Sequence, residues 1–158
     1  MKKKKEKLIE QVREQGVLQQ VAALPYRYRN NGKIDFLVIT SRRTKRLIVP
    51  KGWQMAGKPD YIAAAIEAHE EAGVRGNIGD LPIGSFSYMK EFDDIALPVI
   101  ASVFPLKVKK VKSRWKEEAS RKRKWMSAAK AAALLSDRGL AQLVTQAAEM
   151  LDRRSAMV

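Results

Sequence analysis

Three glutamates in one short stretch of the sequence have the spacing of a metal site. Glu67, Glu70 and Glu71 stand at positions i, i+3 and i+4, so in a helix their carboxylates share one face. Like charges at this spacing repel each other, and the arrangement becomes favourable when a hard divalent cation lies among the oxygens. The spacing therefore predicts a site for Mg²⁺, with Mn²⁺ as the alternative.

A glycine-containing loop, PKGWQMAGKPD, comes directly before these glutamates. Gly52 lets the backbone bend close to the same metal, where it can offer a carbonyl or an amide to the metal or to a phosphate. The glutamates alone would also fit a solvated acidic helix face, and the spacing of the loop favours the metal site. His69 lies off the glutamate face, and we expect it to pack or to face solvent.

Loop and glutamates together resemble the Nudix box, which is a Gly, five residues, a Glu, seven residues, and then Arg-Glu-aliphatic-x-Glu-Glu-x-Gly-aliphatic. The residues that fall on this pattern are Gly52, Glu67, Ala68, Glu70, Glu71, Gly73 and Val74. The resemblance implies a single-domain Nudix α/β/α sandwich with a mixed sheet. It also implies an enzyme that hydrolyses a diphosphate linkage by attack of a metal-activated water at phosphorus.

The resemblance also implies roles for individual residues. Glu70 and Glu71 would be metal ligands, Glu67 a ligand or the general base, and Gly52 part of the metal site. In some relatives a carboxylate outside the box is the base, and Glu117 and Glu118 are the candidates here.

Two positions depart from the box. Lys58 stands where the pattern has its first Glu, which removes an acid and adds a positive charge. Ile66 stands where the pattern has an Arg, whose role in the family is mainly to orient a neighbouring Glu. Weak or altered activity is therefore an open alternative.

Basic residues flank the box on both sides and predict a clamp for a chain of phosphates. The predicted substrate-binding residues are Arg42, Arg43, Lys45, Arg46 and Lys51 before the helix, Trp53 in the loop, and Arg121, Lys122 and Arg123 after it. Trp53 could stack on a base, whereas we expect Trp125 to pack. For each basic residue taken singly, a solvated surface or a contact with nucleic acid is the plainer interpretation.

The stretches ITSRRTKRLIVPKGW and RKRKW look like those of the diphosphoinositol polyphosphate phosphohydrolases, which also handle diadenosine polyphosphates. The resemblance thus favours a diadenosine polyphosphate or an inositol pyrophosphate as the substrate. The alternatives are a nucleoside triphosphate, a capped RNA end, or a non-catalytic module that binds polyphosphate or RNA through a degenerate box. A homodimer is plausible from the resemblance alone.

The composition limits these alternatives only partly. The 158 residues fit one domain, and the net charge of +14 indicates an anionic partner without choosing between phosphorylated small molecules, nucleic acid and anionic membranes. There are no cysteines and one histidine, which excludes disulfides, thiol catalysis and thiolate zinc sites. No stretch has the length of a signal peptide or a membrane span, so we expect a cytoplasmic protein without membrane contact.

Apolar patterning predicts the elements that must position the glutamates. Residues 1–16 read as a basic N-terminal arm or short helix, and residues 17–155 as the Nudix domain. Runs at 17–24 and 35–40 predict a hairpin, because β-branched residues flank a polar loop. A helix over the YIAAAIEAHEEA stretch is expected between Asp60 as N-cap and Gly73 as C-cap.

Beyond this helix, apolar and aromatic residues predict two strands separated by an acidic turn at Asp93 and Asp94. Two helices are expected to follow, one opened by Ser127 and the other by Asp137.

Overall fold

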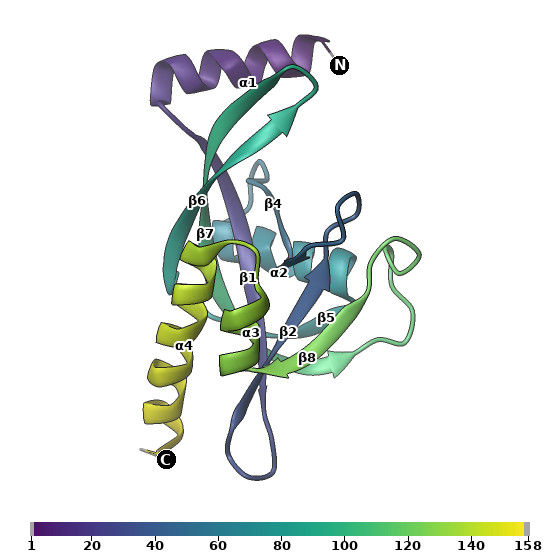
Figure 1. Cartoon of the computed structure of the whole chain (residues 1–158), viewed down its shortest axis with the longest axis vertical. Coiled ribbons are helices and arrows are strands. Elements are labelled where there is room, and N and C mark those ends of the chain that lie inside the picture. Colours follow the sequence, from purple (N-terminus) through teal and green to yellow (C-terminus); the bar gives the residue numbers. More distant parts are fainter. Residues whose placement is uncertain (1, 157–158) are drawn as a thin grey trace.

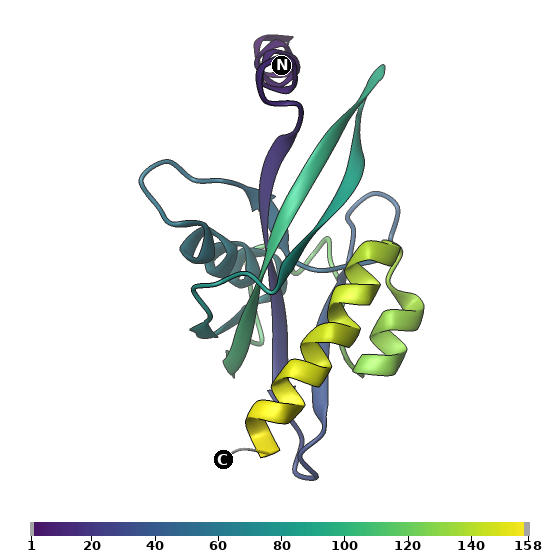
Figure 2. The same cartoon turned by 90° about the vertical axis from the view of Figure 1, so that its left-hand side faces the viewer.

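A mixed sheet with helices on both faces forms the protein, and it confirms the predicted single-domain α/β/α sandwich. The computed structural model describes residues 2–156. The strands are β1 (Leu18–Tyr28), β2 (Ile34–Thr40), β3 (Leu47–Ile48), β4 (Lys51–Trp53), β5 (Val74–Ile78), β6 (Gly84–Phe92), β7 (Ile95–Val111) and β8 (Arg123–Ser127). The helices are α1 (Lys2–Gln15), α2 (Asp60–Ala72), α3 (Ala128–Leu134) and α4 (Arg138–Ala156). Figure 2 shows α2 on one side of the sheet and α3 and α4 on the other.

The parallel pair of β1 and β7 forms the centre of the sheet. The strands follow the order β3-β2-β1-β7-β5, while β4 pairs with β1, β6 with β7 and β8 with β2. β1 and β7 run parallel from the pair Leu18 and Val99 to the pair Tyr26 and Lys107, and the other paired strands are antiparallel. A strand covered on both faces needs apolar residues on both, which explains the nearly continuous apolar run of β1.

Two apolar cores lie on opposite faces of the sheet. Along β2, Phe36 and Val38 face the core beneath α3 and α4, and Leu37 and Ile39 face the core beneath α2. The face of α2 that meets the sheet is made of alanines that are fully buried, namely Ala63, Ala64, Ala68 and Ala72. These small side chains bring the backbone of α2 close to the sheet.

The boundaries of α2 differ from the prediction by one residue at the start. Asp60 is the first helical residue rather than the N-cap; Pro59 takes the N-cap position, without a side-chain hydrogen bond. The Asp60 carboxylate accepts a hydrogen bond from Gln54 Nε2 at 3.1 Å, and its charge still suits the first turn of a helix. Gly73 ends α2 in the left-handed region at φ 66°, which confirms the predicted C-cap.

The remaining elements match most of the predicted pattern. β6 and β7 are the two predicted strands, and they pair as a hairpin whose turn is the predicted one at Asp93 and Asp94. Ser127 Oγ accepts the backbone N–H of Lys130, and Asp137 Oδ1 accepts that of Leu140, as expected of helix N-caps. β8 was not predicted, because its five residues, two basic, two apolar and a serine, have no strand pattern of their own and form a strand only through pairing with β2.

α1 lies across the tip of the β6–β7 hairpin, at one end of the molecule (Figure 1). Its apolar residues Leu8, Ile9 and Val12 belong to the same cluster as Trp53. The Lys5 ammonium pairs with Asp94 in the hairpin turn. The predicted arm begins at Met1, which lies outside the described residues. Among residues 2–156, no helix is long and apolar enough to cross a membrane.

Candidate active site

Glu67 and Glu71 lie one turn apart on α2 and face each other. Glu71 is 5% exposed, and Glu67 is half-buried. Burial raises the pKa of both carboxyls, that of Glu71 to about 9. The hydrogen bond between them lowers the pKa of Glu67 and raises that of Glu71, so they share a proton that resides on Glu71. Arg121 lowers the pKa of Glu71 but does not offset its burial.

Gly52 lets the Glu67 carboxyl lie against the backbone of β4. A Cβ atom at Gly52 would lie 2.5 Å from Glu67 Cδ, which is closer than such atoms approach. The neighbouring backbone N–H of Lys51 donates to Glu71 Oε1 at 3.3 Å. Because β4 is held by pairing with β1, the loop and the two carboxyls form one unit.

Glu70 is turned aside from this pair. Its Oε1 lies 3.6 Å from Lys116 Nζ. The three glutamates therefore do not converge as expected in this arrangement. Within residues 2–156, no group of three or more acidic, histidine or cysteine side chains is placed to hold a metal. Mutual repulsion and the attraction of Lys116 account for the separation. The metal-binding and catalytic roles of the three glutamates stay predictions.

The donor atoms that the structure does bring together suit a hard cation. Glu67 and Glu71 supply carboxylate oxygens, which Mg²⁺ and Mn²⁺ prefer, and the Glu67 carboxyl lies in the space that the absent side chain of Gly52 leaves. A buried and a half-buried carboxyl that are hydrogen-bonded to each other, both with a raised pKa, are also an arrangement that a divalent cation relieves.

Of the two base candidates outside the box, Glu117 lies nearer to the pair. Its negative charge raises the pKa of Glu67, and its Oε1 accepts from Arg121 Nε at 2.9 Å. Glu118 is exposed.

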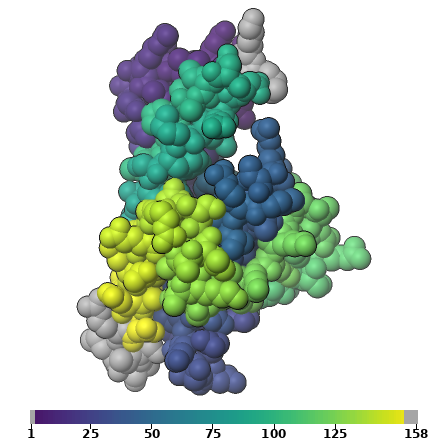
Figure 3. All heavy atoms as spheres, in the orientation of Figure 1, coloured from purple at the N-terminus to yellow at the C-terminus, as the bar shows by residue number. Residues whose placement is uncertain are grey.

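The two basic clusters lie side by side, as the clamp requires. The loop of residues 41–46 and the segment of residues 112–122 adjoin in Figure 3. Lys45 Nζ donates to Ser120 O at 3.3 Å, and Arg42 Nε lies 3.9 Å from Glu117 Oε1. Exposed side chains in the two clusters are Arg42, Arg43, Lys45, Arg46 and Lys122.

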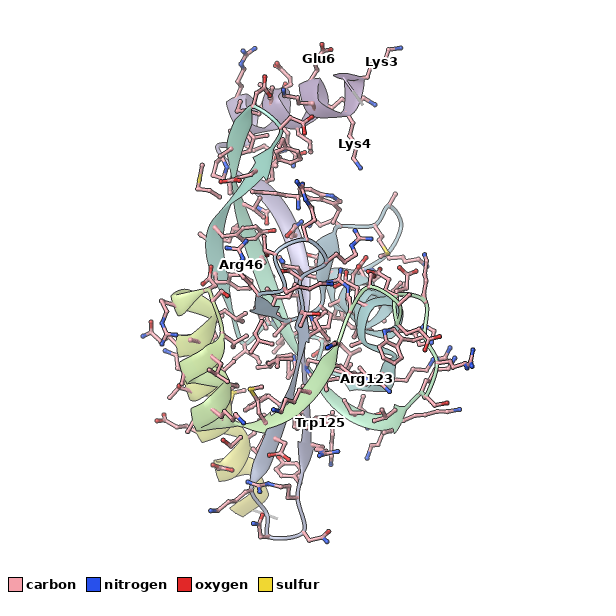
Figure 4. The ribbon with its side chains drawn as sticks, turned by 45° about the vertical axis from the view of Figure 1, so that its right-hand side comes forward. Lys3, Lys4, Glu6, Arg46, Arg123 and Trp125 are labelled. Atoms are coloured by element: carbon pink, nitrogen blue, oxygen red, sulfur yellow. The ribbon has the colours of Figure 1, made fainter. Side chains whose placement is uncertain are left out.

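Arg123 is placed differently from the prediction. Figure 4 shows it on β8 with Trp125. Its Nη1 donates to Ala72 O at 2.8 Å, its Nη2 donates to Lys112 O, and its guanidinium lies 3.9 Å from the centre of the Trp115 ring. These contacts hold Arg123 at the C-terminal end of α2, and its role in substrate binding stays a prediction.

The tryptophans divide between packing and the site loop. Trp125 packs against the core beneath α2, with the Arg27 guanidinium 4.1 Å from its ring centre, as expected. Trp53 is half-buried and packs against the same cluster as the apolar residues of α1, so part of its side chain is used for packing.

A cavity of about 220 Å³ adjoins the carboxyl pair, and sequence reasoning missed most of it. Lys51 connects the two, because its backbone binds Glu71 and its side chain lines the cavity. The walls are Ser41, Arg46, Leu47, Ile48, Val49, Lys51, Phe86, Tyr88, Met89, Ser136, Asp137 and Leu140. They come from strands and a helix start far apart in the chain, and no local motif marks them.

Charge and aromatic groups meet within this cavity. Lys51 Nζ lies 5.2 Å from the centre of the Tyr88 ring, and burial lowers the pKa of Lys51 to about 8 despite the opposing charge of Glu71. The Tyr88 hydroxyl donates to Gln20 Oε1, and burial raises the pKa of Tyr88 to about 12.

Curated proteins similar to the chain are plant Nudix hydrolases. Nudix hydrolase 16, mitochondrial, from Arabidopsis thaliana is 35% identical over 117 residues, which cover 66% of this chain and 64% of that protein. Nudix hydrolase 21, chloroplastic, from the same plant is 32% identical over 119 residues, which cover 73% of this chain and 59% of that protein. The chain thus spans less than two thirds of the length of these relatives. No protein-family profile matches the sequence.

Solved structures share the fold at lower sequence identity. The C. elegans Ap4A hydrolase superposes with a TM-score of 0.63 at 20% identity, covering 85% of this chain and 98% of that one. The Nudix domain of Shewanella oneidensis NrtR, complexed with ADP ribose, has a TM-score of 0.64 at 16% identity and covers 85% and 88%. These likenesses concern the architecture of the sheet and its helices.

Proposed function

The chain belongs to the Nudix hydrolase family, and we propose that it hydrolyses a diphosphate linkage in a phosphorylated small molecule. The observation that carries the proposal is the carboxyl pair of Glu71, which is buried, and Glu67, which is half-buried and lies against Gly52. Such a pair is unstable as two charges in the metal-free protein, and it sits beside a cluster of exposed cations that suits a polyphosphate.

Mg²⁺, with Mn²⁺ as the alternative, is the proposed cofactor. Glu67 and Glu71 would hold it, and Glu70 would also bind it after leaving its contact with Lys116. When bound, the metal supplies an acidified water and neutralises charge that develops on the phosphates.

The remaining steps belong to side chains. Glu67 and Glu117 are the two candidates to accept the proton of the attacking water, because Glu67 lies beside Glu71 and Glu117 lies close enough to raise the pKa of Glu67. Arg42, Lys45 and Arg46 would bind the phosphate chain from the neighbouring loop. Burial of Glu71 limits the access of bulk water to its carboxyl.

The cavity beside Lys51 favours a nucleoside end on the substrate. Its walls include Phe86, Tyr88 and Leu140, against which a planar base can stack, and the carboxylate of Asp137, which can accept a hydrogen bond from an amino group. A fully phosphorylated inositol ring would meet repulsion from that carboxylate. A dinucleoside polyphosphate therefore fits better than an inositol pyrophosphate.

The test is product release from a panel of diadenosine polyphosphates, nucleoside triphosphates, inositol pyrophosphates and capped RNA, with Mg²⁺ or Mn²⁺. We expect turnover of a diadenosine polyphosphate, a loss of at least about 100-fold in Glu71→Gln, and no change in Glu91→Gln, an exposed glutamate on β6. Glutamine preserves the shape of the largely protonated Glu71, so the variant should fold.

A non-catalytic module makes the opposite prediction. It would show no turnover of any substrate together with a tight affinity for RNA that does not depend on Mg²⁺. That combination would overturn the proposed activity.

A further inference from the structure

The segment of residues 112–122, which connects β7 to β8, closes the C-terminal end of α2. The last carbonyls of a helix have no partners within the helix and must find donors elsewhere. Here the segment and the first residue of β8 provide them. The donors are Glu117 N to Glu70 O at 3.1 Å, Trp115 Nε1 to Glu71 O at 3.0 Å, Arg123 Nη1 to Ala72 O at 2.8 Å and Lys112 N to Gly73 O at 2.8 Å.

This capping acts on the residues of the candidate site themselves. The carbonyls of Glu70 and Glu71 are fixed from outside the helix, so the backbone from which both carboxyls project is anchored to the segment. A rigid support of this kind is what sets the orientation of a metal ligand.

The same segment carries a buried guanidinium, that of Arg121. Its side chain is only 8% exposed, whereas Lys122 beside it is exposed. Arg121 Nη1 donates to Thr40 O at 3.1 Å, and Nε donates to Glu117 Oε1 at 2.9 Å. Its Nη2 lies 3.5 Å from Glu71 Oε1. Because the guanidinium is planar and two of its nitrogens are hydrogen-bonded, its third nitrogen, Nη2, can face Glu71 in one orientation only.

No arginine within α2 can do this. Ile66, at the box position where the Nudix pattern has an arginine, has no hydrogen-bonding group in its side chain. The guanidinium that contacts a glutamate of the site comes instead from a segment that begins about 40 residues after the helix.

We propose that Arg121 is a positioning residue, which orients Glu71 for metal binding and takes over the task that Ile66 cannot perform. The inference rests on the proposed function, since it assumes that Glu71 holds the metal. It reassigns Arg121 from the predicted phosphate clamp: a group with its three corners engaged by Thr40, Glu117 and Glu71 has little left to offer a substrate. Arg42, Arg43 and Lys45 remain exposed for that role.

The experiment measures Mn²⁺ affinity, by electron paramagnetic resonance of the free ion, in Arg121→Ala, Arg121→Lys and the control Arg114→Ala. Arg114 is an exposed arginine of the same segment. We expect Arg121→Ala to weaken Mn²⁺ binding about 10- to 100-fold, and Arg121→Lys to fall between, because lysine keeps the charge but loses the planar fork. Arg114→Ala should bind as the wild type does.

Steady-state kinetics on the substrate found active give the second readout. At saturating metal, Arg121→Ala should lower kcat with little change in KM. A rise in KM alone, with Mn²⁺ affinity unchanged, would show that Arg121 contacts the substrate and would overturn the proposal. Should Arg121→Ala fail to fold, as judged by circular dichroism, wild-type Mn²⁺ affinity in Arg121→Lys would overturn it equally.

The proposed function can fail separately. Wild-type protein that turns over no substrate would contradict the hydrolase activity, while a loss of Mn²⁺ affinity in Arg121→Ala would still establish the positioning role.

Discussion

At the scale of single residues, burial brings Glu67 and Glu71 into a pair that suits the proposed metal. Both carboxyls have a raised pKa because they lose water on folding, and the hydrogen bond with Glu67 raises the pKa of Glu71 further. The folded, metal-free protein therefore holds a proton that the unfolded chain releases at a lower pH. Metal binding must displace this proton.

This linkage predicts how stability changes with pH. A carboxyl whose pKa is raised on folding stabilises the protein fully below its unfolded value, and this contribution is lost as the pH rises through the folded value. For Glu71 the window runs from 4.5 to about 9. We expect the Tm in EDTA to fall between pH 6 and pH 8.5, and the rise in Tm on adding Mg²⁺ to be larger at pH 8.5. An equal effect of Mg²⁺ at both pH values would contradict the shared proton.

Gly52 provides a second prediction at this scale. In Gly52→Ala the added methyl group would meet the carboxyl of Glu67, which must then move. We expect Mn²⁺ affinity to fall by roughly 10-fold or more, measured by calorimetry. Circular dichroism would verify the fold, and undiminished affinity in a folded variant would exclude Gly52 from the site.

At the scale of elements, α2 combines a small-residue face toward the sheet with its glutamates toward the loop. The alanines let the helix approach β4 closely enough for Glu67 to reach Gly52. The alanine face of α2 therefore determines both the stability of its packing on the sheet and the position of Glu67 against Gly52.

Enlarging that face should destabilise the protein. Ala68 is fully buried, so the larger side chain in Ala68→Leu would overpack the core. We expect the free energy of unfolding, measured by urea denaturation, to fall by about 1–3 kcal/mol. Ala65→Leu, at a half-exposed position of the same helix, is the matched control and should change it by less. Equal effects at the two positions would argue against close packing of α2.

The elements also show what sequence reasoning can reach. α2, the hairpin around Asp93 and Asp94, and the cap at Gly73 were predictable because each depends on neighbours in the sequence. β8 and the walls of the cavity were not, because strand pairing and the meeting of Tyr88 with Asp137 are long-range. The box likewise identifies Glu71, but the burial of Arg121 against it depends on a distant segment.

At the scale of the whole molecule, positive charge surrounds the candidate site and extends beyond it. The net charge is +14, and Lys3 and Lys4 project from α1 at the end of the molecule away from Arg123 (Figure 4). A field of this kind attracts anions over a range of about 10 Å at 0.1 M salt.

Salt should therefore weaken capture of the substrate more than its conversion. We expect kcat/KM to fall about 10-fold between 0.05 M and 0.5 M potassium chloride, with kcat nearly constant. Steady-state assays at fixed Mg²⁺ measure both quantities. A salt effect confined to kcat would place the influence of charge at the chemical step instead.

The packing of α1 near the hairpin tip has an optical consequence. Trp53 shares an apolar cluster with Leu8 and Val12, and it directly follows Gly52 in the chain. Release of α1 would expose the indole to water and move its fluorescence emission to longer wavelength. In a variant with Trp115 and Trp125 replaced by phenylalanine, Trp53 would be the remaining tryptophan. Its emission would then report, without an attached dye, whether α1 is packed against the cluster next to β4.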